Sequence, residues 1–143
     1  MEGVIDLSYE SLSDKSNIPD TVGQGWIAAE LSESDWTIPV SDEALEEIDQ
    51  MIVLMRNQPL PMLLRNVMDY NIIHLRALYN KVKKVCDCGA GFAVIDQLPI
   101  DEYDIDEMLA VYWVLGQLLG TNVAQKWNGT MIYDVTDTGQ KYG

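Results

Sequence analysis

Residues 91–99 read Gly-Phe-Ala-Val-Ile-Asp-Gln-Leu-Pro. Within this stretch, Phe92 to Ile95 form a short continuous apolar run. Such a run is typical of a strand that is buried on both faces. Glycine precedes it and Leu98-Pro99 follows it, and both are residues that end regular structure. The segment therefore predicts a short interior strand, and the flanking sequence is best described outward from it.

A helix is predicted before this strand, starting after Ser41. Serine is a good N-cap, and the acidic residues Asp42 and Glu43 suit the positive end of the helix dipole. Pro59 and Pro61 end the pattern. Its apolar residues recur at spacings of three and four, as expected for one helix face: Leu45, Ile48, Ile52 and Met55.

A second helix is predicted over residues 62–85. Lysines near its end suit the negative end of the dipole, and Gly89 and Gly91 supply the stop. Its predicted buried stripe comprises Leu64, Met68, Ile72, Leu75, Tyr79 and Val82.

A third helix is predicted to follow the strand, because acidic side chains crowd residues 101–107, as at a helix start. Gly116 would allow a close approach of this helix to the sheet, and Gly120 would be its C-cap. Its predicted inner face comprises Met108, Tyr112, Leu115 and Leu119. After an Asn128-Gly129 turn, alternation over residues 131–135 predicts a further strand.

Residues 1–40 show no sustained periodicity and predict an extended N-terminal arm, with a short helix near Trp26–Leu31. Isolated tryptophans in such an arm usually anchor it in a groove. The arm and the segment after it are acidic: residues 1–50 carry a net charge of −12, against +3 for residues 51–100. This acidity is either a solvated face or a surface that docks on a basic partner.

The composition also excludes several classes of function. A net charge of −14 disfavours binding to nucleic acid. No apolar run is long enough to cross a membrane, and the N-terminus lacks the features of a secretory signal. We therefore expect a cytoplasmic protein with no nucleic-acid or membrane partner.

Few residues suggest chemistry. His74 is the only histidine, and we interpret it as a residue at the boundary of the core. A mononuclear iron site of the 2-His-1-carboxylate type needs two histidines, so this chain cannot build one alone. Cys86 and Cys88 form at most half of a zinc site, and we expect two reduced thiols near a helix end. The acids at 101–107 are interpreted as helix-start charges. The sequence thus predicts no catalytic and no metal-binding residue.

A polar and aromatic cluster follows the third helix: Gln125, Trp127, Asn128 and Tyr133. One interpretation is structural, with turn residues and one packed aromatic ring. The other is that Gln125 or Asn128 lines a substrate pocket. The residues alone leave both interpretations open.

Several segments, taken in order, carry a family resemblance. They begin at Gly25-Trp26 and Asp35-Trp36, continue through residues 41–48, and are strongest from Gly91 to Gly139. Together they resemble the taurine-dioxygenase-like (TauD/TfdA) family of Fe(II)- and 2-oxoglutarate-dependent oxygenases. The resemblance implies an α+β fold, with an N-terminal arm and helices packed on the first strands of an incomplete double-stranded β-helix (clavaminate synthase-like).

The resemblance also implies the domain organisation and the cofactors. Residues 1–40 would be the arm, and residues 41–143 the N-terminal part of the oxygenase domain, truncated before the metal-binding motif. The complete enzyme would use Fe(II) and 2-oxoglutarate to hydroxylate a small organic substrate. We expect neither cofactor to bind this chain alone, because the family's His-x-Asp/Glu motif and its arginine have no counterpart here. Only Gln125 and Asn128 carry over, as substrate-binding residues.

Two other hypotheses stay open. The chain would be a stand-alone helical interaction module, derived from a split or decayed oxygenase. Open edges and apolar surface of a partial sheet would seek a partner or self-associate; a stable monomer would favour the module, and obligate association would favour a fragment of a larger core. Alternatively, the chain would be a small redox or metal protein that uses Cys86 and Cys88. Such a role needs a partner chain.

Overall fold

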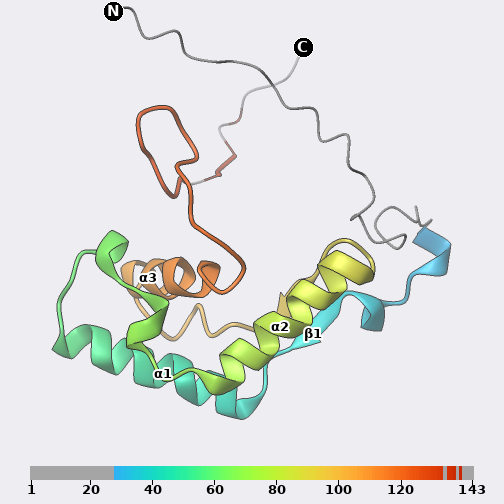
Figure 1. Cartoon of the computed structure of the whole chain (residues 1–143), viewed down its shortest axis with the longest axis horizontal. Coiled ribbons are helices and arrows are strands. Elements are labelled where there is room, and N and C mark those ends of the chain that lie inside the picture. Colours follow the sequence, from blue (N-terminus) through green and yellow to red (C-terminus); the bar gives the residue numbers. More distant parts are fainter. Residues whose placement is uncertain (1–27, 134, 138, 140–143) are drawn as a thin grey trace, which may run out of the picture.

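The computed structural model describes residues 28–133, 135–137 and 139. Over these residues the chain is an α+β structure with a helical body and a small sheet (Figure 1). Its α-helices are α1 (Asp42–Asn57), α2 (Ile73–Cys88) and α3 (Ile105–Gly116). Its strands are β1 (Thr37–Pro39) and β2 (Val94–Asp96), and single 3₁₀ turns span Ala28–Glu30, Glu33–Asp35, Met62–Leu64 and Val67–Asp69.

Helix α1 begins as predicted. Ser41 is its N-cap, and the Ser41 hydroxyl accepts a hydrogen bond of 3.3 Å from the backbone N–H of Ala44. The helix ends at Asn57, just before Pro59. Its buried face includes Ile48, Ile52 and Met55, which confirms most of the predicted apolar stripe.

The second helix is shorter than predicted. Instead of one helix from residue 62, the chain makes two separate 3₁₀ turns and then starts α2 at Ile73. Asn66 favours this break, because its side chain accepts a hydrogen bond of 2.9 Å from the N–H of Met68 and caps the second turn locally. The helix then continues to Cys88 and stops at Gly89, as predicted.

Four of the six residues in the buried stripe predicted for the second helix are therefore buried. Ile72, Leu75, Tyr79 and Val82 are buried in the core. Leu64 and Met68 are exposed, because they lie in the 3₁₀ turns and not in register with the helix face.

Strands β1 and β2 pair in parallel, with Ile38 opposite Ile95. Trp36 precedes β1, its carbonyl accepts a hydrogen bond of 2.8 Å from the N–H of Val94, and its ring lies 5.7 Å from that of Phe92. The strand predicted from residues 91–99 is thus present, but it is not buried on both faces. Val94 is 45% exposed, because the described part of the chain leaves its face of the two-stranded sheet partly open.

The N-terminal arm is only partly described, because residues 1–27 lie outside the described residues, Trp26 among them. Where the arm is described, it differs from an extended segment lying over the core. Residues 37–39 form β1, and the Ile38 side chain is part of the hydrophobic core. Parallel pairing with β2 draws this part of the arm into the fold.

Helix α3 starts as predicted and ends earlier. Asp104 and Glu107 form a capping box at its N-terminus, which confirms the acids as helix-start charges. The helix ends at Gly116 with Gln117 as C-cap, so Gly120 is not the cap. Of the predicted inner face, Met108 and Leu115 are buried, whereas Tyr112 and Leu119 are exposed. The other buried side chains of α3 belong to the core cluster: Ala110, Val111, Trp113 and Val114.

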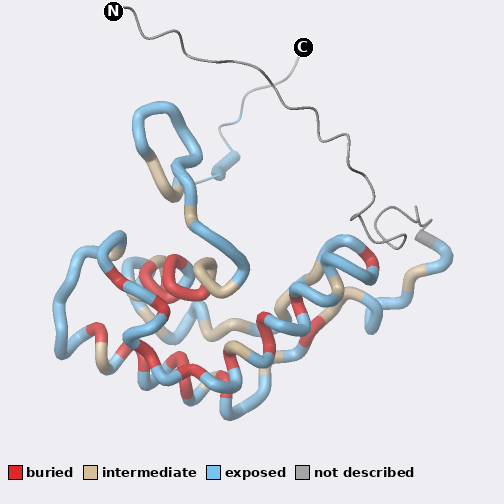
Figure 2. The backbone as a smooth tube through the Cα atoms, in the orientation of Figure 1, coloured by how far each residue is buried: buried red, intermediate tan, exposed pale blue. Residues whose placement is uncertain are grey.

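The core lies among the three α-helices and β1 (Figure 2). An ion pair adds to the packing of α1 against α3: the Arg56 guanidinium donates two hydrogen bonds to Glu107, at 2.6 and 2.9 Å. Part of the segment after α3 leaves this body as a loop (Figure 1), while Leu118, Met131 and Ile132 of the same segment pack against the core. The segment contains a turn at residues 126–129, but no strand among its described residues, so the strand predicted at 131–135 is not observed.

Candidate functional site

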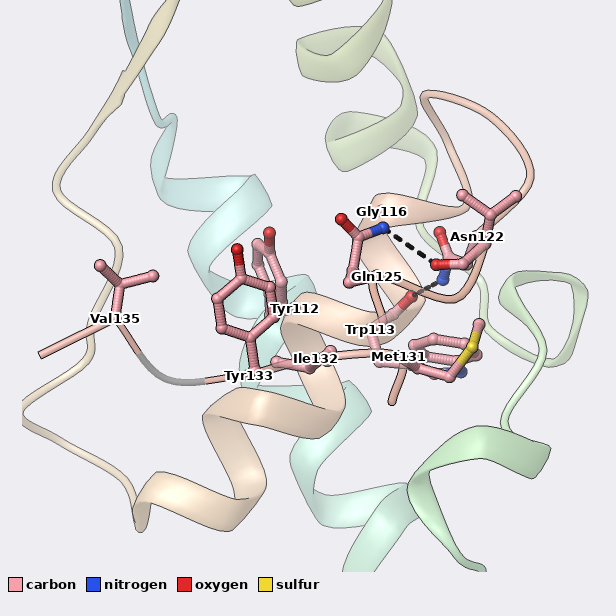
Figure 3. Close-up of a pocket in the computed structure, with 10 residues that line it drawn as sticks. Tyr112, Trp113, Gly116, Asn122, Gln125, Met131, Ile132, Tyr133 and Val135 are labelled. Carbon is pink, nitrogen blue, oxygen red and sulfur yellow. Dashed lines mark hydrogen bonds between the residues drawn. The ribbon is translucent and has the colours of Figure 1, made fainter. Parts of the chain in front are cut away.

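A cavity of about 330 Å³ lies between α3 and the segment that follows it (Figure 3). It is the candidate site because it contains Gln125, one of the two residues that the sequence predicts near a substrate. The residues lining the cavity are Tyr112, Trp113, Gly116, Asn122, Val123, Gln125, Met131, Ile132, Tyr133 and Val135.

The end of α3 shapes one wall of the cavity. Asn122 folds back over the helix, and its side-chain amide donates a hydrogen bond of 3.1 Å to the carbonyl of Trp113. A Cβ atom at Gly116 would lie 3.3 Å from the Asn122 side-chain oxygen, so glycine permits this close approach. The sequence predicted that Gly116 faces the sheet, but its close neighbour is Asn122.

Gln125 is held by its own loop. Its backbone N–H donates a hydrogen bond of 2.7 Å to the carbonyl of Thr130, and its side-chain amide donates one of 2.9 Å to the carbonyl of Val123. The side-chain oxygen of Gln125 is not used in these bonds. A hydrogen-bond donor on a ligand is therefore a suitable partner for it.

Asn128 lies outside the cavity, in the turn at residues 126–129. Its side-chain oxygen accepts hydrogen bonds from the Thr130 N–H, at 3.1 Å, and from the Thr130 hydroxyl, at 2.7 Å. Gly129 has φ +87°, a conformation that favours glycine, and its N–H donates to the Lys126 carbonyl. The structure thus brings Gln125 to the cavity and gives Asn128 a place in the turn that supports it.

The wall of the cavity is aromatic and neutral. Tyr112 and Tyr133 contribute phenol groups on the same side of the cavity (Figure 3). The ammonium group of Lys126 lies 4.6 Å from the centre of the Tyr133 ring, so a cation stands next to the wall without being part of it. Phenol hydroxyls and amides can orient a small polar ligand by hydrogen bonds, while the rings contact its apolar part.

The contribution of Tyr112 and Asn122 to this wall was not predicted. The helical spacing of Tyr112 assigned it to the inner face of α3, whereas it is exposed toward the cavity. Asn122 follows Gly120 and Thr121 in a stretch that reads as an ordinary loop. Its role depends on the chain folding back over the end of α3, for which the sequence holds no local signal.

A second polar arrangement involves Glu47 and the only histidine. The carboxylate of Glu47, on α1, accepts hydrogen bonds from the backbone N–H groups of His74 and Leu75, at 2.9 and 2.8 Å, and from the His74 ring Nδ1, at 2.9 Å. Burial raises the pKa of Glu47, but these hydrogen bonds outweigh it and hold the pKa below its usual value. The prediction of a boundary histidine is confirmed, since the His74 side chain is 52% exposed.

The cysteines lie where they were predicted. Cys86 and Cys88 are exposed free thiols in the last turn of α2. Among the residues that the structure describes, no three His, Cys, Asp or Glu side chains gather in a way that could hold a metal ion. The described helices also include none that is both long enough and apolar enough to span a membrane.

Neither a scan against protein-family models nor a search of curated proteins found a match to this chain.

Proposed function

We propose that this chain is the N-terminal segment of an Fe(II)- and 2-oxoglutarate-dependent oxygenase of the TauD/TfdA-like family. The observation that carries the proposal is the order of the segments from Gly91 to Gly139. In this proposal the helices and strands described above form the beginning of a double-stranded β-helix, with the clavaminate synthase-like arrangement. The complete enzyme would hydroxylate a small organic substrate in the cytoplasm.

The small sheet supports this proposal. Parallel sheets occur almost only where both faces are covered. Here Val94 is exposed on β2, and no third strand pairs with β1 or β2 within the described residues. Tyr112 and Leu119 are likewise exposed on and after α3. In a larger core, further strands would pair with the sheet edges, and elements packed on its open face and on α3 would cover these side chains.

The described residues do not fit the iron site of such an enzyme. His74 is hydrogen-bonded to Glu47, and the chain has no second histidine to complete a 2-His-1-carboxylate set. Iron and 2-oxoglutarate would supply the oxidising chemistry in the complete enzyme. We assign no catalytic step to the present residues and propose that this chain alone is inactive.

We assign substrate contact to Gln125 and support of that contact to Asn128. Gln125 lines the cavity, and its N–H is bonded to Thr130, which is in turn bonded to Asn128. In this proposal Asn128 does not contact the substrate; it holds the turn that positions Gln125.

Two measurements test the proposal. The purified 143-residue chain is expected to show no iron-dependent turnover of 2-oxoglutarate, and such turnover would contradict it. The reading frame downstream of the Gly143 codon is expected to encode His-x-Asp and a later histidine and arginine. A longer protein expressed from that frame should turn over 2-oxoglutarate, and cell fractionation should recover it in the cytoplasm.

A second candidate function is a stand-alone interaction module. The observation that favours it is Trp127, which is 100% exposed at a turn held by several hydrogen bonds. A rigid loop that presents an indole to solvent is a suitable contact point for a partner. A monodisperse monomer with a sharp unfolding transition would favour this function. Obligate self-association through the sheet edges would instead favour a segment of a larger core.

A further inference from the structure

A cavity of about 420 Å³ lies between β1 and the C-terminal half of α2. Residues 37–39 of β1 and Val85 of α2 form one wall, with apolar side chains and the hydroxyl group of Thr37. The other wall carries two ammonium groups and one thiol, from Lys81, Lys84 and Cys88 of α2. It is separate from the cavity beside α3, with which it shares no residue.

Among the other cationic side chains that the structure describes, the arginines and Lys126 have interaction partners, whereas Lys83 is exposed, forms no ion pair with a described residue and does not line the cavity. Arg56 pairs with Glu107, the Arg65 side chain is buried and bonded to Tyr70, and Lys126 lies over Tyr133. Lys81 and Lys84 are exposed, and neither forms an ion pair with a described residue. They are three residues apart on a helix, so they lie on the same face and act on the same space. In a chain of net charge −14, they place two positive charges beside one cavity.

One lining residue, Thr37, also carries a polar group that lacks a partner. The Thr37 hydroxyl is buried and has no hydrogen-bond partner. Leaving a buried hydroxyl unpaired is unfavourable, so an acceptor oxygen that reaches it after a small side-chain movement would be stabilised. Near it, Ile38 and Pro39 offer an apolar surface for the rest of a ligand.

We propose that this cavity binds a small phosphomonoester, with the phosphate between Lys81 and Lys84 and the organic part against Ile38 and Pro39. A phosphomonoester carries close to two negative charges at neutral pH, which two ammonium groups match better than a carboxylate's single charge. Lysine binds phosphate as a point charge and needs no planar geometry. The cavity volume suits one phosphorylated ring or short chain. This site is independent of the proposed oxygenase function, so either can fail alone.

The first test measures binding of phenyl phosphate to the 143-residue chain by calorimetry at low salt. Lys81→Gln and Lys84→Gln are each expected to weaken binding roughly tenfold, since each removes one charge–phosphate contact. Lys83→Gln is the matched control. This substitution removes the same charge from α2, but the Lys83 side chain does not line the cavity. It should change binding by less than about twofold.

The outcome that overturns the proposal is equal weakening by all three variants, which would show general attraction to a basic helix. Absence of saturable binding by the unmodified chain would also overturn it. Circular dichroism of each variant checks that α2 is intact. We expect it to be, because the three substituted side chains are exposed.

A second test uses the two thiols. Cys88 lines the cavity and Cys86 does not, although both are exposed in the same turn. Phenyl phosphate is expected to slow alkylation of Cys88 several-fold and to leave Cys86 unchanged, as read by mass spectrometry of peptides. Benzyl alcohol, which keeps the ring and lacks the phosphate, should protect neither thiol. Equal protection of both thiols, or of neither, by phenyl phosphate would contradict the proposed site.

Discussion

Glu47 lies in the middle of α1, and its carboxylate faces the N-terminus of α2. The first turn of α2 has no capping side chain of its own, since Ile72 occupies the N-cap position. Glu47 accepts hydrogen bonds from the N–H groups of His74 and Leu75, which are among those that a helix start leaves unpaired. One buried carboxylate therefore caps a helix that begins 26 residues later in the sequence.

Replacement of Glu47 should be costly for stability. Glu47→Ala is expected to lower the free energy of unfolding by about 2 kcal/mol, because it removes a charged helix cap and leaves buried N–H groups unpaired. Glu46→Ala is the control, since Glu46 is exposed on the same helix. It should change stability by less than about 0.5 kcal/mol. Urea unfolding of the two variants measures both values, and equal effects would contradict the capping role.

The same residue predicts a pH dependence. Burial raises the pKa of Glu47, and the stronger effect of its hydrogen bonds places the pKa below the ordinary value of 4.5. A carboxyl whose pKa is lower in the folded state stabilises the fold above its unfolded pKa and loses that contribution as the pH falls. The stability difference between the wild-type chain and Glu47→Gln should therefore shrink below about pH 4.5. Urea unfolding at pH 7 and at pH 3.5 checks this, and a constant difference would exclude it.

At the scale of elements, the register of α3 decides which apolar residues enter the core. Leu115 is 1% exposed, whereas Leu119 is 45% exposed, although helical spacing places both on one face. The helix ends at Gly116, so Leu119 is beyond it and no longer follows the helical periodicity.

This difference predicts unequal effects of one substitution. Leu115→Ala is expected to lower the free energy of unfolding by about 3 kcal/mol, because it leaves a cavity in the core. Leu119→Ala should lower it by less than about 1 kcal/mol. Thermal or urea unfolding compares the two, and a similar loss in both would mean that Leu119 is buried in solution.

At the scale of the whole molecule, net charge opposes association and apolar surface favours it. The chain carries −14, yet Leu64, Met68, Trp127 and Val135 are more than half exposed. Exposed apolar side chains favour association where two copies bring them together.

Self-association should therefore rise with salt. Screening weakens the repulsion between acidic copies, while burial of apolar side chains is unaffected or strengthened. Sedimentation velocity at about 0.02 M and 0.5 M NaCl is expected to show a larger associated fraction at the higher concentration. A smaller associated fraction at the higher salt concentration would instead indicate contacts between the acidic residues 1–50 of one copy and the lysines of α2 in another.

Local signals in the sequence were sufficient for several features. The N-cap at Ser41, the acidic start of α3, the stop at Gly89 and a strand within residues 91–99 were all predicted. Each depends on residues within a few positions of one another, through capping bonds, the helix dipole or turn preferences. The α+β class follows from their sum. At the candidate site, the sequence predicted Gln125 near a cavity, but not the cavity's other walls.

Other features were decided only by the tertiary structure. The start of α2 at Ile73 depends on Glu47 of α1, and the wall formed by Asn122 depends on the chain turning back over α3. The exposure of Val94 depends on which elements pack on its face of the sheet. These outcomes arise from contacts between residues far apart in the chain. Periodicity and capping preferences describe only near neighbours, so they establish where helices and strands can form, while packing selects their ends and their buried faces.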